Sequence, residues 1–183
     1  MADPSTAIKI AFVVFGLGFL FFLFGFSSPY WHLMEWVDHG HPRTTYYGLW
    51  KHCQEQARYR SLPYDFCFSL ISGDYARDYI RAAQFFETVG FLTALVSLII
   101  LLLSICIGSC QNRRILPILS AITAFAAAGC IILGCIIFGA KDEEKNNLSW
   151  AFALTLVGGI LFAIVGVIVL VFSVIKKGTT ESV

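Results

Sequence analysis

The stretch GLWKHC spans residues 48–53, and a second cysteine follows at Cys67. Both cysteines lie in a segment that separates two long apolar stretches. Two cysteines close to a tryptophan of the kind that is usually buried predict a small loop fold closed by a Cys53–Cys67 disulfide. Two unpaired thiols are the weaker alternative. Because disulfides persist in oxidising compartments, we expect this loop outside the cytosol.

The apolar content of the chain predicts a membrane protein. Of its 183 residues, 57% are hydrophobic, and the mean hydropathy is +0.74. A soluble domain of this length cannot bury so much apolar surface. Four stretches are almost free of charge, and each is close to the roughly 20 residues that a helix needs to cross a bilayer. We expect four helical spans at about residues 8–28, 82–108, 115–140 and 148–175.

The basic residues in short loops predict the orientation of these spans. Arg113 and Arg114 lie between the second and third spans, and Lys176 and Lys177 follow the fourth. Both termini, including a tail at residues 176–183, are therefore expected in the cytoplasm. The loops at about 29–81 and 141–147 are then extracellular, in agreement with the expected disulfide. The first apolar stretch is longer than a cleavable signal peptide needs, so we expect it to remain as a span.

The first extracellular loop is the only segment outside the membrane that is long enough to fold. Its runs Arg43–Lys51 and Tyr64–Ile71 are rich in aromatic and β-branched residues and predict short strands. A Cys53–Cys67 bond would stabilise this loop by about 3 kcal/mol in the chain-entropy model. We expect a small antiparallel sheet seated on the helix bundle.

Several of these residues together resemble a known signature. Trp31, the run Gly48-Leu49-Trp50, the two cysteines and Arg81 are similar to the pattern W…GLW…C…C…R of the claudin superfamily. That group includes claudins, peripheral myelin and epithelial membrane proteins, lens fibre membrane protein and calcium-channel gamma subunits. The resemblance implies one domain over residues 1–183, a left-handed four-helix bundle with an extracellular β-sheet. It also implies that Trp31 and the Gly48–Trp50 run anchor the sheet against the outer leaflet and that Arg81 closes the base of the loop.

The chain departs from typical claudins in its two loops. The gap between the cysteines is wider, which predicts a longer hairpin tip at Gln54–Tyr64. The second loop is shorter, as in the myelin and epithelial branch, so adhesion through that loop is not expected. A glycosylation sequon at Asn147 abuts the membrane boundary and is expected to be unmodified.

Two features of the cytoplasmic side resemble claudins. The tail ends in Glu181, Ser182 and Val183, which is similar to tails that add as a strand to PDZ domains. Cys106 and Cys110 lie at the end of the second span, where cysteines are candidates for palmitoylation. Ordinary buried thiols are the equal alternative there.

Charged residues of the first loop are candidates for a pore or contact surface. In claudins, charges near the cysteine hairpin line the paracellular pore. Their signs nearly cancel here, so the ion preference stays open, and a solvated rim is the alternative. The candidates are Lys51, Glu55, Arg58, Arg60 and Asp65.

Glu87 is an acid near the membrane interior, where such residues usually mark a function. Its position beside Arg81 and Gln84 suggests solvation by water or by a loop. We therefore expect an interfacial structural role rather than an ion pathway.

The sequence shows no catalytic or metal-ligand motif. His39, His41 and His52 share a loop without ligand spacing, so no metal or cofactor is expected. No pattern typical of an enzyme occurs, and a net charge of +1 gives no reason to expect nucleic acid.

Three functions fit these features. The first is a plasma-membrane protein of cell–cell junctions, which assembles with like four-span proteins in cis and trans, forms a paracellular barrier or pore, and binds a PDZ scaffold protein. The second is a gamma-type auxiliary subunit of an ion channel or receptor. The third is a myelin-type or lens-type membrane-organising protein.

Overall fold

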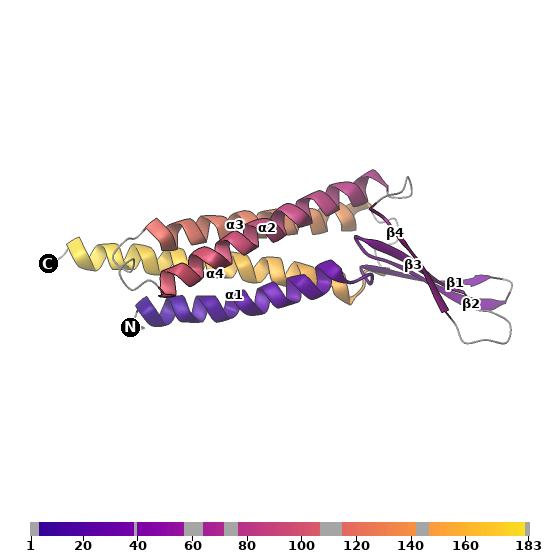
Figure 1. The fold of residues 1–183 in the computed structure, drawn as a ribbon, viewed down its shortest axis with the longest axis horizontal. Coiled ribbons are helices and arrows are strands. Elements are labelled where there is room, and N and C mark those ends of the chain that lie inside the picture. Colours follow the sequence, from indigo (N-terminus) through magenta and orange to yellow (C-terminus); the bar gives the residue numbers. More distant parts are fainter. Residues whose placement is uncertain are drawn as a thin grey trace.

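The computed structural model has four long helices and a sheet that extends from one end of them (Figure 1). It describes residues 4–38, 40–56, 64–71, 77–106, 115–141 and 147–181. The elements in chain order are helix α1 (Pro4–Ser27), strands β1 (His32–Asp38), β2 (His41–Tyr47), β3 (Lys51–Gln56) and β4 (Tyr64–Ser69), and helices α2 (Asp78–Cys106), α3 (Ile115–Lys141) and α4 (Trp150–Glu181). Helix α1 begins and α4 ends at the end of the bundle that is opposite the sheet.

All four helices are long and apolar enough to cross a membrane. Large apolar side chains such as Val13, Phe24 and Phe85 point outward and are largely exposed. A bundle in water would carry polar residues at such positions, whereas hydrocarbon makes apolar ones favourable. The predicted four-span architecture is confirmed. Helix α2 begins at Asp78, a turn before the expected apolar stretch, and its first turn includes the charged residues Asp78 and Arg81.

The helices pack most closely as α2 on α3, α1 on α4 and α3 on α4. Aromatic residues fill the interior, and the rings of Phe15 and Phe162 stack with centroids 4.4 Å apart. The Ser97 hydroxyl donates a hydrogen bond of 3.1 Å to the Ser120 carbonyl and joins α2 to α3. Both serines are buried, so the bond satisfies polar groups that lipid could not.

The sheet is antiparallel with strand order β1-β2-β3-β4. Its register gives it two different faces. One face carries the row His32–Tyr47–His52–Phe68, which lies nearest the helices, and the other carries both cysteines. Tyr47 packs against Phe138 of α3 with ring centroids 6.1 Å apart, so the aromatic face meets the bundle.

The expected strand Arg43–Lys51 is wrong as a single element. The structure divides it into the end of β2, a turn at residues 48–50, and the start of β3. The Gly48 N–H donates to the Lys51 carbonyl at 2.9 Å and closes this turn. Leu49, at the centre of this turn, is buried against the bundle. Strand β1 was not predicted.

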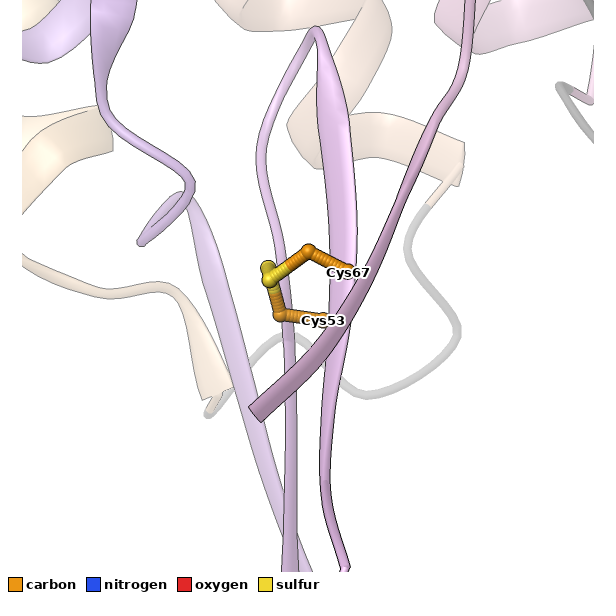
Figure 2. The surroundings of a disulfide bond; sticks show 2 residues. All are labelled: Cys53 and Cys67. Atoms are coloured by element: carbon orange, nitrogen blue, oxygen red, sulfur yellow. A yellow bond between two sulfur atoms is a disulfide. The ribbon is translucent and has the colours of Figure 1, made fainter. Parts of the chain in front are cut away.

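The Cys53–Cys67 disulfide is confirmed and joins β3 to β4 (Figure 2). The two cysteines are directly opposite in the register of these strands. Their bond ties the last strand of the sheet to the strand beside it. Residues 57–63, the centre of the expected hairpin tip, lie outside the described part of the chain.

The link between α3 and α4 is attached to the sheet at its α4 end. Leu148 forms an isolated antiparallel bridge with His32 of β1. The Ser149 N–H donates to the Trp31 carbonyl at 2.9 Å. The described end of this loop therefore lies along the β1 edge of the sheet.

Candidate functional site

The seat of the sheet on the bundle begins with two tryptophans at the end of α1. The indole N–H of Trp31 donates to the Gly25 carbonyl at 2.7 Å, and that of Trp50 donates to the Phe26 carbonyl at 2.9 Å. The last carbonyls of a helix have no partner within the helix and need one from elsewhere. Both tryptophans therefore cap α1 while they fix the two ends of the first hairpin to it.

These contacts change the expected role of the tryptophans. The resemblance placed Trp31 and the Gly48–Trp50 run against the outer leaflet. Trp31 and Leu49 are fully buried in protein, in a cluster with Phe138 of α3 and Ala151 of α4. The sheet is therefore anchored on the helices rather than on lipid.

Gly48 is required by the close approach of two chain segments. A Cβ atom there would collide with the Ser28 carbonyl and would lie 2.8 Å from the Cα of Pro29. The turn can therefore sit directly on the segment that leaves α1 only if residue 48 lacks a side chain. This geometry explains the order Gly-Leu-Trp. Gly48 allows the close approach, Leu49 buries its side chain, and Trp50 caps α1.

Gln84 is an anchor that the sequence did not reveal. Its side-chain amide donates to the Leu49 carbonyl and so joins α2 to the turn between β2 and β3. The sequence assigned the base of the loop to Arg81. That residue lies in the first turn of α2 with an exposed side chain, and its role stays a prediction.

The candidate charges do not all share one place. Lys51 is exposed, and Glu55 is half-buried on the same face of β3 as Cys53. Asp65 is paired with Glu55 in the register, and Glu35 of β1 lies on the same face of the sheet as Glu55. Arg58 and Arg60 lie outside the described residues.

The distal end of the β1–β2 hairpin exposes apolar side chains. Trp36 is 40% exposed and Val37 is 70% exposed. The Arg43 guanidinium lies 5.9 Å from the centre of the Trp36 ring, and the indole N–H of Trp36 donates to the Thr45 hydroxyl. This end of the hairpin lies far from the helices (Figure 1), so the bundle does not cover these side chains.

The candidates that we expect on the cytoplasmic side are described only in part. Cys106 is the last residue of α2 and is exposed. Helix α4 extends to Glu181, so the start of the tail is helical. Cys110, Ser182 and Val183 lie outside the described residues.

Neither the histidines nor the other ligand-type side chains gather into a metal site in the part of the chain that the structure describes. His52 is half-buried, with its ring 4.7 Å from Phe68 and 5.7 Å from Tyr47. Burial lowers the pKa of His52 because desolvation disfavours the charged imidazolium. His39 lies outside the described residues.

The expected solvation of Glu87 is wrong. Its side chain is 0% exposed and lies against Gly134 and Cys135 of α3. The error arises because the residues of α3 that cover it are distant in the sequence.

Four apolar spans, with a disulfide-bonded sheet between the first and second, define a multi-pass membrane protein of the claudin-like type. The family model for PMP-22/EMP/MP20/Claudin tight junction proteins matches residues 16–171, which include the sheet, the second and third spans, and most of the first and fourth spans. The chain belongs to this family. A comparison with curated proteins found no match.

Replacing Trp50 by Phe tests the capping of α1. The ring contact with Phe26 (centroids 5.1 Å apart) can be kept, but the Phe26 carbonyl loses its donor. We expect the free energy of unfolding to fall by about 1–3 kcal/mol, the usual cost of a buried unsatisfied group. Thermal or denaturant unfolding in detergent measures the change. Trp36→Phe is the control, because the Trp36 indole is exposed, and an equal loss in both variants would contradict the capping role.

The lowered pKa of His52 predicts a loss of stability in acid. The folded state keeps His52 neutral, whereas the unfolded chain takes up a proton below the ordinary histidine pKa of about 6.5. The free energy of unfolding should therefore fall as the pH decreases from about 6.5 toward the lowered pKa of the folded state. Above the ordinary histidine pKa, His52 should not change the stability. Melting temperatures across this range measure the effect. His52→Gln should flatten the profile, and an unchanged profile would exclude His52 as the cause.

Proposed function

We propose that the chain is a structural protein of cell–cell junctions in the plasma membrane, with both termini cytoplasmic and the sheet outside the cell. The observation that carries this proposal is the apolar end of the β1–β2 hairpin, at Trp36 and Val37. A sheet fixed to its bundle holds these side chains away from the membrane, where they can meet a protein on the opposite cell. Exposed apolar groups at such a place are typical of protein contacts.

The attachment of the second loop supports this assignment of the contact. Its described end is bonded to β1 through Leu148 and Ser149. A loop that is short and tied to the sheet has little freedom to reach an opposite cell. The first loop, rather than the second, therefore supplies the trans contact with like proteins.

Acidic residues of the sheet would give the proposed junction a preference for one sign of ion. Glu35 and Glu55 lie on one face of the sheet, and the register pairs Glu55 with Asp65, so acidic positions gather in this part of the sheet. Lys51 lies on the same face, four positions before Glu55 in β3. If this face lines the path between cells, the carboxylates favour cations over anions.

At the end of the bundle opposite the sheet, the C-terminal tail would bind a cytoplasmic scaffold protein. A PDZ domain binds its ligand as an added strand, so the helical turn that ends at Glu181 must unwind before the tail can bind. The exposed thiol of Cys106 at the membrane boundary suits palmitoylation, which would hold this end of α2 at the lipid surface.

Expression in non-adherent fibroblasts tests the junctional function. We expect enrichment at cell contacts and strands in freeze-fracture images. Val37→Glu should reduce both at least several-fold, because a charge at the contact must be desolvated. Val13→Leu, on the outer surface of α1, is the matched control, and surface labelling confirms delivery of every variant.

Uniform surface distribution without strands would reject the proposal. If the protein then co-purified with a channel in fixed ratio, the auxiliary-subunit function would replace it. If Val37→Glu leaves the enrichment at cell contacts intact, the junctional function would stand. The end of the β1–β2 hairpin would then be excluded as the contact surface.

Glu55→Gln tests the ion preference in an epithelial monolayer. Loss of the Glu55 carboxylate should lower the permeability of sodium relative to chloride by about two-fold or more. Added salt should weaken the effect, because it screens the charges. Dilution potentials measure the ratio. Lys9→Gln, at the other end of the molecule, is the control. An unchanged ratio would show that this face does not line the path.

A further inference from the structure

Glu87 is a buried acid within a membrane-spanning helix. Its Oε1 accepts a hydrogen bond from the Cys135 thiol at 3.5 Å, while Oε2 is buried without a hydrogen-bond partner among the described residues. The side chain is 0% exposed, so water does not complete the set. A buried oxygen in this state calls for an explanation.

The described residues around the Glu87 carboxyl supply no positive charge. Cys135 of α3 is the titratable side chain that contacts it in the described chain, and no ion pair with Lys, Arg or His forms there. An ionised carboxylate without water or a counter-charge is strongly unfavourable in such a place. A proton on the carboxyl removes the charge without changing the shape of the side chain.

Gly134 of α3 forms a seat for the carboxyl. A Cβ at residue 134 would lie 2.6 Å from Oε1 and 3.0 Å from Cδ of Glu87. The Glu87 carboxyl and the backbone of α3 are thus in direct contact. A hydration shell around the carboxyl would not fit between α2 and α3 at this place.

The same face of α2 carries the anchor of the sheet. Gln84, which donates to the Leu49 carbonyl, lies one turn from Glu87 toward the sheet. Any separation of α2 from α3 at Glu87 therefore displaces the group that holds the Gly48–Trp50 turn.

We propose that Glu87 is a proton-binding site that holds α2 against α3 and, through Gln84, holds the sheet on the bundle. The neutral acid fits its seat beside Gly134 and Cys135. Ionisation places an unpaired charge there, so the two helices separate and the seat of the sheet loosens. The site needs no partner protein and is independent of the junctional function.

The purified full-length protein in detergent tests the site by its melting temperature at neutral and alkaline pH. We expect the wild type to lose about 4 °C or more beyond the loss in Glu87→Gln, which cannot ionise. Cys135→Ala should keep the alkaline loss and so exclude the thiol as its source. Glu55→Gln, which changes a half-buried acid outside the bundle, should behave as the wild type. Parallel profiles for the wild type and Glu87→Gln would overturn the proposal, as would failure of this neutral isostere to fold.

Infrared spectra at neutral pH report the protonation state directly. The wild type should show the carbonyl band of a protonated carboxylic acid that is missing in Glu87→Gln. A carboxylate band that disappears in the variant would overturn the proposal.

A double-mutant cycle tests the seat. Gly134→Ala should lower the melting temperature by about 4 °C or more, and Glu87→Ala should recover part of that loss in the double variant, because it makes room for the added methyl group. Additive losses would contradict direct contact.

Discussion

The capping of α1 by two indole N–H groups is the interaction on which the arrangement of sheet and bundle depends. A helix that ends at a membrane surface has carbonyls that neither lipid nor the helix itself can satisfy. Trp31 and Trp50 satisfy two of them from opposite ends of the β1–β2 hairpin. The polar requirement of the helix end thereby fixes the direction in which the sheet leaves the bundle.

Much of this architecture could be predicted from the sequence. Long uncharged stretches have few outcomes other than bilayer spans, and two lone cysteines in one exported loop have few outcomes other than a bond. Strand β1 was missed because its residues alternate weakly: Met34 and Trp36 lie on one face, while Leu33 and Val37 lie with Glu35 on the other. Neither face is consistently apolar, so the period of two that indicates a strand is absent.

The errors at the seat have a different physical origin. The amide of Gln84 bonds to the backbone carbonyl of Leu49, and the carboxyl of Glu87 rests on Gly134, so neither contact involves a partner side chain that a sequence pattern could reveal. The proximity of Arg81 along the chain suggested that Glu87 is solvated. The exposure of Glu87 depends instead on residues of α3 that are distant in the sequence. Contacts between helices that are distant in sequence decide whether such a polar residue meets water or protein.

Trp31 also gives the molecule a mechanical property. Its side chain is bonded to the end of the first span, and its backbone carbonyl is bonded to Ser149, just before the fourth. Tension applied to the sheet would therefore be divided at one residue between helices from the two ends of the sequence. Those helices pack side by side along their length, so the force would spread into the bundle as shear rather than pull a single span out of the lipid.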